Sequence, residues 1–103
     1  MIMQQVFFSE NELKELSDYK ESSGMSFKAI LEKAFDYYIK NDLPYIKSQY
    51  IFYATIGQER KQRKGIGISD QLNNELTEFC NQHNYSKSAV AAQAILAYIR
   101  KDK

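Results

Sequence analysis

The sequence repeats itself once, and this repeat constrains the fold more than any other feature. Residues 4–42 align with residues 64–102 without a gap, at an offset of sixty residues, and nine of the thirty-nine pairs are identical. The identical pairs are Ser9/Ser69, Glu15/Glu75, Leu16/Leu76, Ser26/Ser86, Ala29/Ala89, Ala34/Ala94, Tyr38/Tyr98, Ile39/Ile99 and Asp42/Asp102. A unit of about forty residues rarely buries enough apolar surface to fold alone. We therefore expect the two copies to share one core, within the chain or with a second chain.

Each copy opens with a short alternating segment. Val6 and Phe8 share one side of the first segment, and Ile66 and Ile68 share one side of the second. A period of two residues predicts a strand with one buried face. Phe7 then points outward, although a slip of one residue in the strand phase would turn it toward the core. Because a lone short strand is not stable, we expect the two strands to pair with each other.

Two helices are predicted to follow each strand. Glu12 stands three residues after a serine and completes a capping box. The first helix of each copy is expected to end at Gly24 or Asn84, residues that tolerate the left-handed conformation. Pro44 is expected to end the second helix of the first copy. The serines placed as helix N-caps are Ser9, Ser26, Ser69 and Ser86.

Apolar residues recur at helical spacing in all four predicted helices, so each helix should bury one stripe. In the first helix, the stripe of the first copy is Leu13, Leu16 and Tyr19, and that of the second copy is Leu72, Leu76, Phe79, Cys80 and His83. In the second helix, the stripe of the first copy is Ile30, Leu31, Ala34, Phe35, Tyr38 and Ile39, and that of the second copy is Val90, Ala91, Ala94, Ile95, Tyr98 and Ile99. The expected fold class is mainly α with a two-stranded ribbon.

An aromatic and basic segment, residues 43–62, separates the copies. Periodicity does not decide whether residues 46–59 form a helix or are partly extended. Residues 43–64 hold five Lys or Arg and one Asp or Glu, so the positive charge is concentrated here. The basic cluster within it is either part of a solvated linker or a contact for an anionic partner. The cluster consists of Arg60, Lys61, Arg63 and Lys64. Tyr50, Phe52 and Tyr53 are a patch that packs on the core or a surface for self-association.

Several classes of protein are disfavoured by the composition. A single cysteine and a single histidine are too few ligands for a structural zinc site. We expect Cys80 to be a small core residue and His83 to serve packing or capping of its helix. No nucleophile, base and acid form a catalytic set, so we expect no enzyme activity and no cofactor. The N-terminus does not resemble a signal peptide, and no apolar run approaches the roughly 20 residues of a membrane span. We expect a cytoplasmic protein without membrane partners, in the host cytoplasm if the chain is viral.

Each copy resembles the ribbon-helix-helix DNA-binding family in its order of strand, helix and helix. In the second copy the resemblance is carried by ISDQLNNELTEFCNQHNYSKSAV. The strand followed by Ser and an acidic residue, and the small polar SKS turn, are similar to those of plasmid copy-number repressors. The resemblance covers residues 2–42 and 63–102. Both units lie in one chain, as in the rarer tandem members among plasmid and archaeal-virus regulators. It implies a pseudo-dimer whose strands pair as a two-stranded antiparallel ribbon, in a fold that is mainly α. The first motif would span 1–42, the linker 43–62 and the second motif 63–103.

The resemblance also implies a map of contacts with double-stranded DNA. The outward residues of the ribbon would contact bases: Met3, Gln5 and Phe7 from the first strand, and Arg63, Gly65 and Gly67 from the second. The glycines depart from the family pattern, since they offer bases no side chain, and the surface would be lopsided. The starts of the second helices would contact phosphates through Ser26, Phe27, Lys28, Ser86, Lys87 and Ser88, with Arg60, Lys61 and Lys64 as a basic arm.

The function implied is sequence-specific binding of double-stranded DNA and regulation of transcription, as a repressor or an activator. Side-by-side assembly on DNA is expected, because one ribbon touches few base pairs. Two alternatives remain open. One is an accessory protein that marks or bends a plasmid transfer origin. The other is an antitoxin-type module in which the aromatic linker binds a partner protein.

Overall fold

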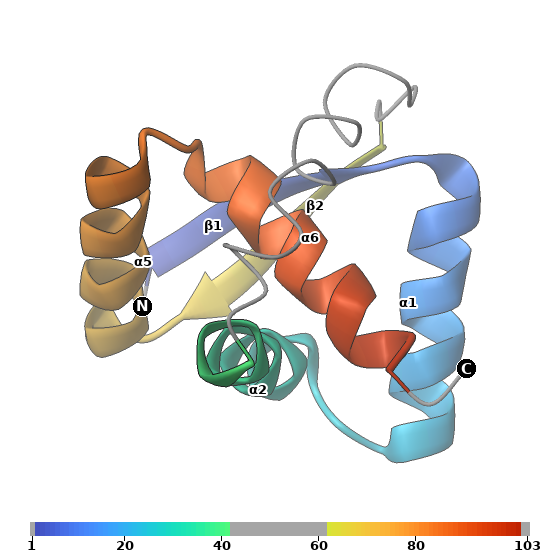
Figure 1. The fold of residues 1–103 in the computed structure, drawn as a ribbon. Helices are drawn as coiled ribbons and strands as arrows, with labels where there is room; N and C mark the ends of the chain where they lie inside the picture. Colours follow the sequence, from blue (N-terminus) through green and yellow to red (C-terminus); the bar gives the residue numbers. More distant parts are fainter. Residues whose placement is uncertain (1, 42–61, 102–103) are drawn as a thin grey trace.

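The computed structural model describes residues 2–41 and 62–101 (Figure 1). These residues form two strands and four helices, in the order strand, helix, helix in each of two series. The first series is β1 (Ile2–Phe8), α1 (Glu10–Ser23) and α2 (Phe27–Lys40). The second is β2 (Gln62–Ile68), α5 (Asp70–His83) and α6 (Lys87–Ile99). The predicted class, mainly helical with a two-stranded antiparallel ribbon, is confirmed at this level.

The register of the ribbon is symmetric with respect to the sequence repeat. Gln5 pairs with Gly65, which is its own counterpart at the offset of sixty residues. The pairs on either side are Met3 with Gly67 and Phe7 with Arg63, and each is the counterpart of the other. An approximate two-fold axis therefore passes through Gln5 and Gly65.

The core lies between the inner face of the ribbon and the two helices that cross it, α2 and α6 (Figure 1). β1 packs against α6 and β2 packs against α2, so each strand rests on the other series' helix. The two series are thus interlocked, as units too small to fold separately must be. The largest fully buried side chains are Val6, Phe8, Leu16, Ile30, Leu31, Tyr38, Ile66, Ile68, Leu76, Val90 and Ile95.

The helix ends follow from local hydrogen bonds. All four predicted N-cap serines accept an amide hydrogen bond within their helix. Ser9 and Glu12 form the predicted capping box, in which the Ser9 amide donates to Glu12 Oε1 over 2.8 Å. Gly24 and Asn84 are in the left-handed region, at φ of 72° and 63°. These four starts and two ends are confirmed.

Three expectations about the helices need correction. Ile39, predicted to lie on the buried stripe of α2, is 40% exposed, because no other described helix covers the last turn on that side. His83 is exposed, although its ring contacts Phe79 at 4.4 Å between ring centres and stacks on Tyr85 at 5.6 Å. α2 ends at Lys40, before Pro44, because Asn41 caps it and its Nδ2 donates to the Tyr37 carbonyl over 2.9 Å.

Candidate nucleic-acid interface

The outer face of the ribbon carries the side chains expected there. Met3 is 59% exposed and Phe7 39% exposed, while Gln5 and Arg63 are also exposed. Gly65 is exposed and Gly67 is half-buried. The intervening apolar residues face inward, as strand alternation requires. The predicted phase, including the outward position of Phe7, is confirmed.

The outer face differs from one end of the ribbon to the other. At one end the phenyl ring of Phe7 is paired across the ribbon with the guanidinium-bearing Arg63. At the other end Met3 is paired with Gly67, so a single thioether occupies the position. The approximate symmetry of the backbone therefore carries an asymmetric set of side chains.

Gly65 leaves room for side chains of the opposite strand. A Cβ atom at this position would lie 3.0 Å from Met3 Sδ, 3.2 Å from Met3 Cγ and 3.5 Å from Gln5 Nε2. Side chains of β1 thus lie over the centre of β2. This overlap could not be predicted from the sequence, since it depends on the strand register.

At the start of α2, two lysines lie over one aromatic ring, and a third lysine follows that aromatic residue in the sequence. Lys64 Nζ lies 4.3 Å and Lys20 Nζ 5.3 Å from the centre of the half-buried Phe27 ring, both within the range of a cation–π contact. Lys28 follows in the first turn of the helix, and Ser26 accepts the Ala29 amide over 3.1 Å. We call Lys20, Lys28 and Lys64 the α2 lysine cluster. Lys20 was not among the predicted residues, because it lies in the preceding helix.

The start of α6 is built differently. Ser86 accepts the Ala89 amide over 3.1 Å, as its counterpart does in α2. Lys87 Nζ donates to Asn73 Oδ1 over 3.3 Å, and the Ser88 hydroxyl donates to the Gln5 carbonyl over 2.8 Å. Ser88 therefore attaches α6 to the centre of the ribbon. Ser86 thus occupies the Ala89 amide, whereas the amides of Lys87 and Ser88 have no acceptor within the helix and remain suited to an anion.

The remaining predicted contact residues lie outside the described part of the chain. These are the basic residues Arg60 and Lys61 and the aromatic residues Tyr50, Phe52 and Tyr53.

Within residues 2–41 and 62–101, no three His, Cys, Asp or Glu side chains are placed to hold a metal ion. No helix in the same ranges is both long and apolar enough to cross a bilayer. Cys80 is 3% exposed, and burial raises the pKa of its thiol to about 11, so it acts as a small core residue.

Comparisons of the chain with protein-family models, with curated proteins and with solved structures give no significant match.

Proposed function

We propose that this chain binds double-stranded DNA as a tandem ribbon-helix-helix protein and regulates transcription. In this proposal the chain supplies both halves of a pseudo-dimer, and the β1–β2 ribbon enters the major groove. The observation that carries it is the outer ribbon face, on which Gln5, Phe7 and Arg63 are exposed around an approximate two-fold axis. A two-stranded ribbon is one of the elements that fit this groove.

The exposed side chains have the chemistry of base recognition. The amide of Gln5 can bond adenine at two positions, and the guanidinium of Arg63 can bond guanine at two positions. The ring of Phe7 can contact the methyl group of thymine. Because Phe7 and Arg63 pair at one end of the ribbon, their base contacts would be adjacent. The preferred duplex is therefore expected to be non-palindromic.

Phosphate contacts would fix the position of the ribbon without reading sequence. The N-termini of α2 and α6 supply free amides and the positive ends of helix dipoles. The α2 lysine cluster adds three cations at one end, whereas Lys87 is hydrogen-bonded to Asn73 at the other. The grip on the backbone is expected to be stronger on the α2 side.

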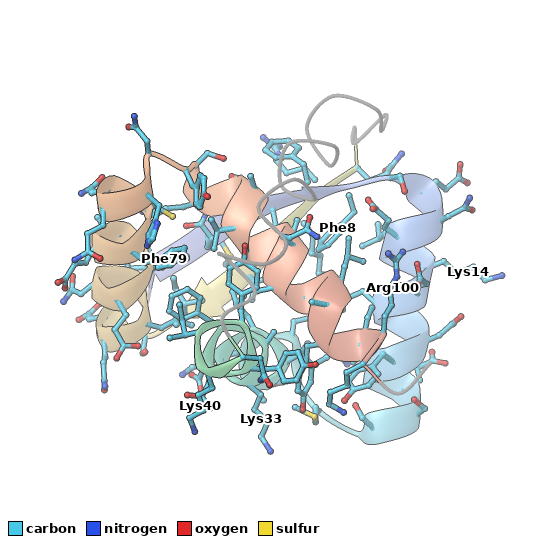
Figure 2. All side chains as sticks on the ribbon, viewed as in Figure 1. Phe8, Lys14, Lys33, Lys40, Phe79 and Arg100 are labelled. Atoms are coloured by element: carbon cyan, nitrogen blue, oxygen red, sulfur yellow. The ribbon has the colours of Figure 1, made fainter. Side chains whose placement is uncertain are left out.

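The first experiment is selection of bound duplexes from a random pool, followed by titration of the selected duplex with variants. Arg63→Ala should weaken binding of the selected duplex by about tenfold or more, since a two-point guanine contact is worth roughly 1–3 kcal/mol. Lys28→Ala should weaken all duplexes alike. Lys33→Ala is the matched control, because the exposed Lys33 points away from the ribbon (Figure 2).

Salt separates this proposal from a protein-interaction role. DNA affinity should fall steeply as salt rises, because bound phosphates release counterions. Failure of the selection to enrich any duplex, or equal binding by Arg63→Ala and Lys33→Ala, would remove the ribbon from the interface.

A further inference from the structure

A groove of about 600 Å³ runs between α2 and α5, away from the outer face of the ribbon. Its apolar lining combines two buried residues with two that are partly open to solvent. Phe79 makes an edge-to-face contact there with Phe35, at 5.9 Å between ring centres. The apolar residues that line the groove are Phe35, Ile39, Leu72 and Phe79.

The rim of this groove is acidic. Carboxylates enter it from both helices, and no Lys or Arg is among the described residues that line it. Lys40 lies near, but its Nζ is 3.0 Å from Asp36 Oδ2 on its own helix. The acidic residues of the rim are Glu32, Asp36, Glu75 and Glu78.

The other half of the molecule shows how the equivalent position is filled. The counterpart of Glu75 is Glu15 on α1. Arg100 lies at the end of α6, beside α1 (Figure 2), and donates two hydrogen bonds of 3.0 and 2.6 Å to the Glu15 carboxylate. The counterpart of Ile39 is Ile99, which is 6% exposed where Ile39 is 40% exposed. The buried Ile99 and the ion pair of Arg100 with Glu15 thus hold the end of α6 against α1.

Two sequence differences explain why α2 and α5 are not closed in the same way. Lys40 stands where α6 has Arg100, and a lysine cannot form the two-point contact of a guanidinium. Asp36 stands where α6 has Leu96, so Lys40 has a carboxylate one turn away on its own helix. Glu75 is consequently left on the rim, where its described hydrogen bond comes from Gln71 Nε2 over 3.5 Å.

We propose that this groove binds a basic, amphipathic helical segment of a partner protein. Aliphatic side chains of the segment would cover Ile39 and Leu72, and an arginine would bind Glu75 as Arg100 binds Glu15. Charge complementarity selects this occupant, because the rim carries carboxylates on both sides. DNA phosphates are repelled by the same charge. A second copy placed groove to groove would oppose carboxylates with carboxylates.

The test uses the full chain and a labelled peptide with the sequence of residues 91–101, AAQAILAYIRK, which carries the aliphatic and arginine pattern of α6. Fluorescence anisotropy measures binding, and methyl NMR locates it. The peptide should shift the methyl signals of Ile39 and Leu72. Glu75→Gln and Glu78→Gln should each weaken binding about fivefold, the upper range for an exposed ion pair. Glu21→Gln, an exposed carboxylate on α1, is the matched control and should bind as the parent does.

A second peptide, with Arg100→Glu and Lys101→Glu, leaves the protein unchanged and should not bind. Four results would overturn the proposal. The first is that the peptide shifts NMR signals outside the groove, and the second is that Glu75→Gln and Glu21→Gln bind it equally. The third is NMR contacts in the free protein between the groove methyls and residues 42–61. The fourth is a dependence of the groove signals on protein concentration without peptide, which would identify a second copy as the occupant. None of these outcomes depends on DNA binding.

Discussion

Two glycines illustrate how differently a single residue type acts in this chain. Gly24 has a φ of 72° and no atom within 4 Å of the position a Cβ would take, so its role is purely conformational. Gly65 lies in a strand, and its role is to leave space for Met3 and Gln5. Substituting each residue by alanine therefore tests a different physical effect.

Gly24→Ala should lower the free energy of unfolding by about 1 kcal/mol or more, because a Cβ disfavours the left-handed conformation. Gly65→Ala should leave the free energy of unfolding unchanged or raise it by up to about 1 kcal/mol, because alanine restricts the unfolded chain and the exposed, flexible Met3 side chain can move aside. Urea denaturation of both variants measures the difference. A loss of stability in Gly65→Ala equal to that in Gly24→Ala would show that the Met3 side chain cannot move aside.

The thiol of Cys80 provides a second test at this scale. Burial raises its pKa from 9.0 to about 11, so the neutral thiol is the form favoured by the fold. Because of this rise in pKa, the folded chain at pH 8 holds about a hundredfold less thiolate than the unfolded chain. The thiolate is the reactive form. Disulfide exchange with an aromatic disulfide reagent should thus be at least this much slower in the native protein than in urea. Comparable rates would show that Cys80 is accessible.

At the scale of the helices, the starts are determined by side chains close in sequence. Ser9 accepts the Glu12 amide over 3.2 Å and Ser69 accepts the Leu72 amide over 3.1 Å. These bonds need no tertiary contact, which is why the helix starts could be predicted from the sequence. The exposure of Ile39 could not, because it depends on how far α5 stands from α2.

Ser9→Ala and Ser69→Ala should each lower the free energy of unfolding by about 1 kcal/mol, the usual value for loss of an N-cap acceptor. Ser17→Ala, on the exposed side of α1, is the control and should change it by less than about 0.5 kcal/mol. Urea denaturation followed by circular dichroism gives all three values. Equal effects of Ser9→Ala and Ser17→Ala would show that the cap is not formed in solution.

For the whole molecule, the repeat predicted the main relationship in the fold. Because two small copies had to share a core, pairing of their strands followed from length and periodicity, whereas its antiparallel direction was implied by the family resemblance. The sequence did not reveal the difference between the two helix pairs, α1 with α6 and α2 with α5. That difference depends on Arg100 reaching Glu15 while Lys40 turns to Asp36, a choice between partners that are distant and near in sequence.

Pairing of β1 with β2 within one chain makes folding unimolecular. The midpoint of thermal unfolding should therefore be independent of protein concentration over a hundredfold range, whereas strand exchange between chains would raise it with concentration. Differential scanning fluorimetry at several concentrations gives the answer. Sedimentation equilibrium of the same samples separates exchange of strands from association through another surface.

The pairing of Gln5 with Gly65 has a consequence for how recognition can change by mutation. In an assembly of two identical chains, one codon supplies both residues at the centre, and every substitution there appears twice. In this chain two codons supply them, so one position holds an amide while the other stays empty to accommodate it. Each strand can accordingly acquire a new side chain without imposing the same change on its neighbour.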